Sequence, residues 1–152
     1  MEKKTTDIKI NYDDVPLSWK HCFYEACPMK AECLHYQTGK VLPDDKNFGM
    51  AIYPNALKDG KCRFFKEIRI INAAWGFNTI FQEVKSKDDT PLRREIKDYL
   101  GSNGTYYKYH NGDLLLTPEQ QAWIIALFKQ YGYSEGLTFD HYVAILDYNC
   151  GL

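Results

Sequence analysis

The chain has 152 residues, of which 45% are hydrophobic and 26% are charged, as in an ordinary folded domain. These shares exclude a disordered, collagen-like or coiled-coil chain, and no apolar run reaches the roughly 18 residues that a membrane helix needs. Nineteen basic residues against twenty acidic ones give a net charge of −1, so the molecule as a whole is not a polycation that would coat nucleic acid.

A group of cysteines marks the N-terminal third. Three of them lie in the segment HCFYEACPMKAECLH, and Cys62 follows in DGKCRFF. The first residues lack the apolar segment of a secretory signal, so we expect a cytoplasmic protein with reduced thiols. A total of five cysteines also fits a disulfide framework poorly. We expect Cys150, near the C-terminal end, to stand apart from the group.

Clustered thiols in a reducing compartment are typical of a metal site, because thiolates are strong, soft ligands. We therefore predict a structural Zn²⁺ site without a catalytic role. Its ligands would be Cys22, Cys27, Cys33 and Cys62. Either of the flanking residues His21 and His35 could replace one thiolate. Two alternatives stay open: an iron–sulfur cluster on the same four thiolates, or no metal and four small buried side chains.

Short elements are expected around the cysteines. Pro28 suits the first turn of a short helix over residues 29–37, and Gly39 would stop that helix. Residues 48–53 and 62–65 are apolar enough for two short strands, with a turn over residues 55–60 between them. The N-terminal third thus predicts a small strand element beside the cysteine cluster.

A helical period follows. Apolar residues recur at helical spacing from Ile70 to Phe77 and again from Phe77 to Val84, which predicts a helix that Gly76 breaks into two pieces. Residues 85–90 read as a polar loop. Thr90-Pro91 then opens a second helix that ends at Gly101, with one apolar face. That face consists of Leu92, Ile96, Tyr99 and Leu100.

Two more helices are predicted toward the C-terminal end. Thr117-Pro118-Glu119-Gln120 is a capping box with proline at the first helical position, and it opens the strongest helix of the chain, which stops at Gly132. Thr138 caps a last helix with apolar residues at helical spacing. These are Phe139, Tyr142, Val143 and Leu146.

Together these elements predict a single domain over residues 1–152 in the α+β class. It is predominantly α-helical, with a two- or three-strand element near the cysteine cluster. We divide it into a Cys-rich metal-binding subdomain, residues 1–66, and a helical part, residues 67–152. Residues 61–112 contain ten basic against six acidic side chains, a net charge of +4, so this block could touch phosphates.

Residues 91–121 resemble a helix-turn-helix of the Cro-repressor kind. The matching features are Leu100-Gly101, the segment TYYKY, Asn111-Gly112 and Thr117-Pro118-Glu119. The resemblance implies that Tyr106, Lys108 and His110 face DNA. It also implies phosphate contacts from Arg93, Arg94 and Lys97. The turn is one residue shorter than that pattern, and Gly104 lies where the recognition helix would begin.

The same segment also fits a β-hairpin. Residues 106–110 are rich in tyrosine and prone to form a strand, and Asn111-Gly112 is the strongest two-residue hairpin signal. Residues 114–116 would then be the return strand. Sequence alone leaves both interpretations open, and a hairpin would remove most of the support for DNA binding.

The chain as a whole resembles an uncharacterised bacterial domain-of-unknown-function family. The resemblance rests on the head Trp19…Cys22-x4-Cys27-Pro28-x4-Cys33-Leu34, on Gly60-x-Cys62-x-Phe64, and on YYKY leading into LTPEQQ. It spans nearly the full length and implies one full-length domain, with no activity to transfer.

Three functional hypotheses follow. The first is a small cytoplasmic, metal-stabilised binding protein that contacts nucleic acid through residues 91–112. The second is a protein–protein adaptor without nucleic-acid binding, favoured by the near-neutral charge and the twelve tyrosines. The third is a thiol redox or iron–sulfur protein. The chain contains no Walker loop, dinucleotide-binding glycine motif, HExxH or nucleophile elbow, so we do not expect an enzyme. Its partners would be DNA or another protein, and not a membrane.

Overall fold

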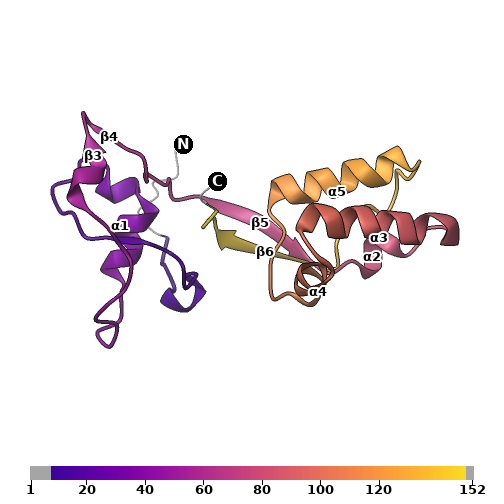
Figure 1. Ribbon diagram of the computed structural model, residues 1–152, viewed down its shortest axis with the longest axis horizontal. Coiled ribbons are helices and arrows are strands. Elements are labelled where there is room, and N and C mark those ends of the chain that lie inside the picture. Colours follow the sequence, from indigo (N-terminus) through magenta and orange to yellow (C-terminus); the bar gives the residue numbers. More distant parts are fainter. Residues whose placement is uncertain (1–7, 150–152) are drawn as a thin grey trace. The chain divides into compact units, whose positions relative to one another are not determined.

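The computed structural model describes residues 8–149, and this range contains five α-helices and six short strands (Figure 1). The predicted α+β class is therefore confirmed. Helices predominate only in the part of the chain that runs from α2 to α5. None of the helices in the described range is long and apolar enough to cross a membrane.

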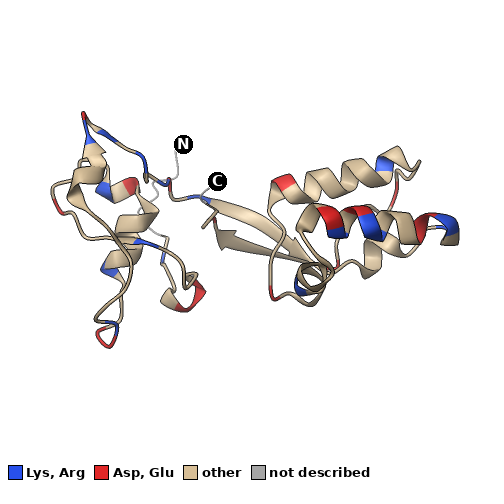
Figure 2. Ribbon diagram, viewed as in Figure 1, with Lys and Arg blue, Asp and Glu red and all other residues tan. Residues whose placement is uncertain are grey.

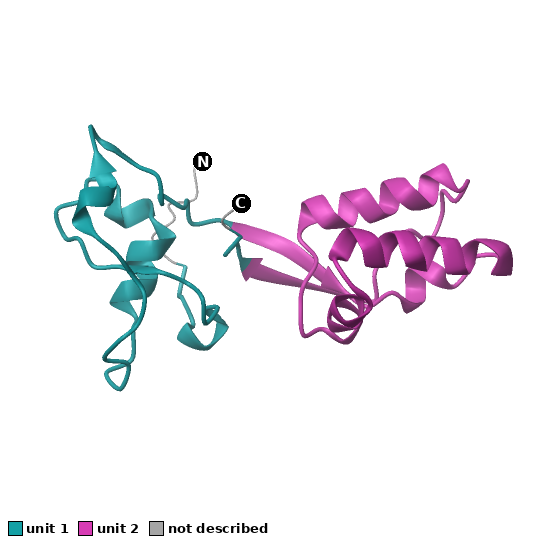
Figure 3. Cartoon of the chain, in the orientation of Figure 1, with its two compact units in different colours: residues 1–69, 146–152 teal, residues 70–145 magenta. Residues whose placement is uncertain are grey.

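The chain divides into two compact units (Figure 3). Unit 1 contains the described residues up to Arg69 together with those from Leu146 onward, and unit 2 is Ile70–Ile145. Unit 2 is thus inserted into unit 1 along the sequence. The four described cysteines all belong to unit 1, while Cys150 lies outside the described residues.

Unit 1 is built from very short elements. Its α-helix in the described range is α1 (Leu34–Lys40), and three single turns of 3₁₀-helix accompany it: η2 (Tyr12–Asp14), η3 (Lys30–Glu32) and η4 (Pro54–Ala56). Two-residue strands form a parallel pair, β1 (His21–Cys22) with β2 (Ala51–Ile52), and an antiparallel pair, β3 (Leu57–Lys58) with β4 (Lys61–Cys62). The strands expected over residues 48–53 and 62–65 are therefore only two residues long.

The helix predicted over residues 29–37 is interrupted at Cys33. This residue has extended backbone angles and forms an antiparallel bridge with Glu67, so the chain cannot remain helical there. Helix α1 continues through Gly39 to Lys40, so the expectation that Gly39 stops the helix is wrong. A Cβ at this position would lie 2.6 Å from the backbone oxygen of Cys22. Glycine at this position allows α1 to pack directly on β1.

A tight hairpin joins β3 to β4. Asp59 and Gly60 both have left-handed backbone angles, with φ of 52° and 75°. Two consecutive positive φ values define a type I′ turn, for which Asp-Gly is a preferred sequence. The turn places Lys58 directly opposite Lys61 in the strand register.

The apolar core of unit 1 is small. Its core cluster consists of the buried residues Trp19, Leu34 and Ile68, and Tyr148 packs edge-on against Trp19 with ring centroids 5.0 Å apart. The indole N–H of Trp19 donates to the hydroxyl of Thr38 over 3.0 Å. A core of this size supplies little stability by itself.

Ion pairs anchor the last described residues to unit 1. Asp147 is buried, and its Oδ2 accepts hydrogen bonds from Lys66 Nζ at 3.1 Å and from an Arg69 guanidinium nitrogen at 2.8 Å. Burial opposes ionisation of Asp147, but hydrogen bonds from Arg69, Asn149 and Lys66 outweigh it and lower its pKa. A lowered carboxyl pKa contributes stability above the ordinary value near 4, and this contribution is lost as the pH falls through the lowered value.

We therefore expect Asp147→Asn to lower the free energy of unfolding by about 2 kcal/mol at neutral pH, since charged hydrogen bonds contribute about that much. Urea denaturation at about pH 7 and about pH 3 measures the effect. The difference between parent and variant should shrink at the lower pH. An equal difference at both values would contradict the role of the ionised carboxylate.

Unit 2 combines a two-stranded sheet with four helices. The strands are β5 (Ile70–Trp75) and β6 (His141–Leu146). The last residue of β6, Leu146, is the first residue of the second segment of unit 1. The helices are α2 (Asn78–Phe81), α3 (Ser86–Leu100), α4 (Asn103–Asn111) and α5 (Pro118–Gln130). Their facing side chains form one core cluster, whose largest fully buried members are Tyr106, Phe77, Phe128, Leu92, Ile96, Leu116 and Ile124.

Two predicted helices are wrong, because β5 and β6 occupy their positions. In β5, Ala73 and Ala74 are both buried, since Ala74 also bridges to Leu116 on its other side. Consecutive buried residues mimic a helical period over such a short stretch. The loop expected over residues 85–90 is also wrong, since α3 already begins at Ser86. The Tyr133 hydroxyl fixes this first turn: it accepts from the Lys85 N–H at 3.0 Å and donates to Asp88 at 2.6 Å.

The capping box at the start of α5 is confirmed. Thr117 accepts from the Gln120 N–H at 3.3 Å, and the Gln120 side chain accepts from the Thr117 N–H at 2.9 Å. We expect Thr117→Ala to lower the free energy of unfolding by about 1 kcal/mol, as loss of an N-cap usually does. Thr90→Ala, an exposed position inside α3, is the control and should be nearly neutral. Equal losses in urea denaturation would contradict the capping role.

Residues 103–111 form α4, so the β-hairpin interpretation is wrong. Ser102 caps the helix by accepting from the Thr105 N–H at 3.1 Å. Gly112 ends it with φ of 87°, the left-handed conformation that glycine adopts most easily. Asn111-Gly112 thus terminates a helix instead of turning a hairpin.

Candidate functional site

Four thiols from separate parts of unit 1 line one cavity of about 30 Å³. Cys22 comes from β1, Cys27 from the turn before η3, Cys33 from the position before α1, and Cys62 from β4. Cys22, Cys27 and Cys33 are close in sequence, and the fold brings the distant Cys62 to the same place. The remaining walls of the cavity include the side chains of Ile52 and Phe64.

Backbone pairing fixes where the cysteines lie. Cys22 is the partner of Ile52 in the parallel pair of β1 and β2, and Cys62 is the partner of Leu57 in the hairpin. Cys33 is held by its bridge to Glu67. These contacts position the backbones of three of the four cysteines.

The electrostatic surroundings of Cys22 favour the neutral thiol. Burial raises its pKa, a hydrogen bond from the Tyr24 backbone offsets part of this, and the neighbouring Cys33, Cys27 and Cys62 raise it further. A cation among the sulfurs would reverse this preference, because a metal ion deprotonates the thiols that it binds.

The two flanking histidines differ in position. His35 lines the cysteine cavity, is buried, and stacks on Trp19 with ring centroids 4.1 Å apart. Its Nδ1–H donates to the backbone oxygen of Lys20 over 2.6 Å, the kind of contact that orients a metal-binding imidazole. His21 lies in the wall of a different cavity. His35 is thus the histidine placed to replace a thiolate.

The side chains do not form a ready ligand set. Within residues 8–149, no group of three or more His, Cys, Asp and Glu side chains could hold a metal ion as oriented. The cavity volume of about 30 Å³ equals the share of one molecule in liquid water. A metal ion at this place would require the thiols to turn toward it.

Three of the predicted nucleic-acid contacts are engaged inside unit 2. Tyr106 is only 1% exposed and stacks on Phe77, so the expectation that it faces DNA is wrong. Arg93 donates to Asp89 at 2.8 Å and to the Tyr106 hydroxyl at 2.9 Å. His110 accepts from the Phe77 N–H at 3.2 Å. These contacts tie the three side chains to neighbouring groups of unit 2.

The other three predicted contacts lie nearer the surface. Arg94 and Lys108 are exposed, and the ammonium of Lys97 lies over the rings of Tyr106 and Tyr107 at 5.2 and 5.6 Å. Figure 2 shows acidic and basic residues interspersed along α3. The helices therefore lack the continuous basic stripe that marks a duplex-binding surface.

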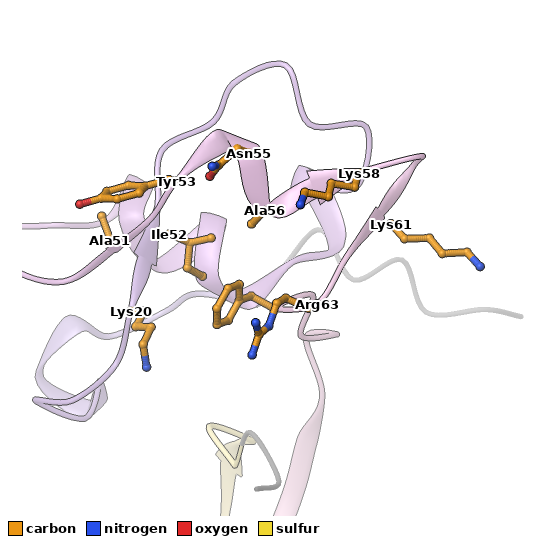
Figure 4. A pocket seen from close by; sticks show the side chains of 10 residues that line it. Lys20, Ala51, Ile52, Tyr53, Asn55, Ala56, Lys58, Lys61 and Arg63 are labelled. Carbon is orange, nitrogen blue, oxygen red and sulfur yellow. The ribbon is translucent and has the colours of Figure 1, made fainter.

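A concentration of basic side chains in unit 1 was missed by the sequence analysis. Lys20, Lys58, Lys61 and Arg63 line a cavity of about 570 Å³ together with Tyr53 and Phe64 (Figure 4). Lys20 and Lys58 belong to the first 60 residues, which have no excess of basic residues, so counting charge along the sequence does not reveal the group.

Comparison with known proteins gives one finding. No curated protein and no solved structure matches the chain. A family model described as a family of unknown function covers residues 1–148, almost the whole chain. This agrees with the full-length resemblance to an uncharacterised family, and the chain belongs to that family of unknown function, DUF6078.

Proposed function

We propose that this protein is a small cytoplasmic binding protein whose unit 1 is held together by a structural Zn²⁺. The ligands would be Cys22, Cys27, Cys33 and Cys62, with His35 as the alternative fourth ligand. The observation that carries the proposal is the convergence of these four thiols on one cavity.

The architecture of unit 1 supports a structural role for the ion. Its strands are two residues long, and its apolar core cluster contains only three buried residues in the described range. Small domains with so little core usually need a metal or disulfides. The cysteines come from β1, β4 and the segment before α1, so one ion would link all of these elements.

We favour a zinc ion over an iron–sulfur cluster at this site. Four sulfurs about 2.3 Å from a central ion form a closed tetrahedron, which leaves no position for a catalytic water. The space of about 30 Å³ accommodates one ion. We therefore infer no enzymatic role for this site.

Elemental analysis with an absorption spectrum, on protein purified without oxygen, tests the proposal. We expect about one zinc per chain and no visible absorption band. Iron content together with the visible absorption bands of a cluster would identify the centre as iron–sulfur and would contradict the assignment of zinc. Protein that contains no metal, and whose thermal stability does not change when zinc is added, would overturn the proposal.

Nucleic-acid contact through α3 and α4 is a second candidate function. It is favoured by the helical conformation of residues 103–111 and by the exposure of Arg94 and Lys108. An adaptor role is the alternative, favoured by Tyr99 and Trp123, which stack 3.8 Å apart and are both more than a third exposed. The control variant described below separates a helix-based nucleic-acid site from one in unit 1.

A further inference from the structure

The cavity of about 570 Å³ in unit 1, here called the basic groove, has a one-signed charge. Lys20, Lys58, Lys61 and Arg63 line it, and no acidic residue of the described range does. None of these four side chains forms a salt bridge with the residues that the structure describes. By contrast, the neighbouring Lys66 is paired with Asp147.

The β3–β4 hairpin concentrates like charges at one end of the groove. Lys58 and Lys61 are direct partners across the two strands, and both are exposed. Like charges opposite each other destabilise a strand pair, so this arrangement has an energetic cost in the free protein. An anion bound beside the hairpin would remove that cost.

Aromatic rings accompany the charges. Tyr53 is 74% exposed, and Figure 4 shows it at the opposite end of the groove from Lys61, with Ile52 between the two ends. Phe64 also lines the groove, and the Arg63 guanidinium lies 5.1 Å from the centre of its ring. Exposed rings give platforms on which bases can stack.

The groove continues into a second cavity. A space of about 790 Å³ shares Lys20, Arg63 and Phe64 with it and extends to Lys66 and Phe65. The two cavities therefore form an extended face that contains both basic and aromatic side chains. A compact anion such as free phosphate would use the charges of this face but not its length or its exposed rings.

We propose that the basic groove binds single-stranded nucleic acid, with phosphates beside Lys20, Lys58 and Arg63 and a base stacked on Tyr53. Single-strand sites combine a positive groove with aromatic platforms in this way. The inference concerns a ligand that the metal proposal does not include. Ile52 and Phe64 line both the groove and the cysteine cavity, and Cys62 lies between Lys61 and Arg63 in the chain.

Fluorescence anisotropy with a labelled oligodeoxythymidylate of about 12 nucleotides tests the proposal on the full chain. Binding should weaken with salt, with a logarithmic slope near −2, because about three phosphates would be neutralised at about 0.7 each. We expect Arg63→Glu to weaken binding by tenfold or more and to flatten the slope. No binding at low salt would overturn the proposal.

Tyr53→Ala separates base stacking from simple anion binding. Loss of one stacking platform should weaken binding about tenfold and leave the salt slope unchanged. An undiminished affinity would show that the groove binds phosphate charge alone, which would overturn the assignment. Stronger binding to anionic phospholipid vesicles than to the oligonucleotide would overturn it as well.

Arg94→Glu is the matched control, with the same change of charge on the exposed surface of α3. It should leave the affinity unchanged. If it weakens binding and Arg63→Glu does not, the site lies on the helices and the groove proposal fails. The metal content and thermal transition of each variant should equal those of the parent, so failure here is distinguishable from failure of the zinc proposal.

Discussion

Cys27→Ser is expected to remove the bound metal and to lower the free energy of unfolding by at least about 3 kcal/mol, since structural zinc contributes several times that amount. For a chain of 152 residues the loss corresponds to a decrease in Tm of roughly 6–12 °C. The physical reason is that unit 1 has only two-residue strands and a small core. Little else therefore holds the cysteine-bearing segments together. A thermal scan followed by circular dichroism measures the effect.

Two controls make this result specific. Cys150→Ser exchanges the same atoms at a cysteine outside the proposed ligand set and should leave Tm unchanged. Treating the parent protein with a strong chelator should reproduce the Tm of Cys27→Ser, and the chelator should not affect the variant further. Equal small effects of both serine substitutions, together with no response to the chelator, would show that no thiolate centre exists.

Gly76→Ala is expected to lower the free energy of unfolding by about 3 kcal/mol. Gly76 has φ of 87°, and a Cβ there would lie 2.5 Å from a carboxylate oxygen of Asp140 and 2.7 Å from its Cβ. Asp140 cannot move away freely, since its carboxylate accepts from the N–H groups of Asn78 at 3.1 Å and Thr79 at 2.7 Å. These bonds hold the first turn of α2.

The state of Asp140 reflects the same contacts. Burial opposes its ionisation, but the hydrogen bonds from Thr79 and Asn78 outweigh it and lower the pKa.

Gly104→Ala is the matched control for the Gly76 substitution, because Gly104 lies in α4 with only Ser102 Oγ, 3.9 Å away, near an added Cβ. It should stabilise the protein by about 0.5 kcal/mol. Urea denaturation that gives the same sign for both variants would contradict the explanation.

The predictable parts of the fold are those encoded by local interactions. The capping box at Thr117 needs only four neighbouring residues, and the structure contains both of its hydrogen bonds. Gly101 and Gly132 both follow helices, as their positive φ values allow. The apolar face at Leu92 and Ile96 is fully buried, because a helix of this length repeats its pattern often enough to be recognised.

The parts that could not be predicted depend on contacts distant in sequence. Ile70–Trp75 becomes a strand because β6, some 65 residues later, pairs with it, and because Leu116 bridges to Ala74. Six residues are too few to separate a strand from a helix by periodicity alone. Tyr106 is enclosed by Phe77 and Arg93, and neither contact can be inferred from the pattern around residue 106.

The candidate sites show the same division. The cysteine set could be proposed from the sequence because its members share one chemistry and three of them are close together. The basic groove could not, since Lys20 is brought to Arg63 only by the folding of unit 1. When charge is summed over blocks of sequence, Lys20 and Arg63 fall into different blocks. The excess of positive charge that they form in space is therefore not visible in the sequence.

The insertion of Ile70–Ile145 within unit 1 has a consequence for the order in which the chain folds during synthesis. Every residue of the inserted helices leaves the ribosome before Asp147 and Tyr148, which contact Lys66 and Trp19. Unit 2 is therefore able to form its core while unit 1 still lacks Asp147 and Tyr148. The core of the cysteine-bearing unit 1 is accordingly completed only after the whole of Ile70–Ile145 has been synthesised.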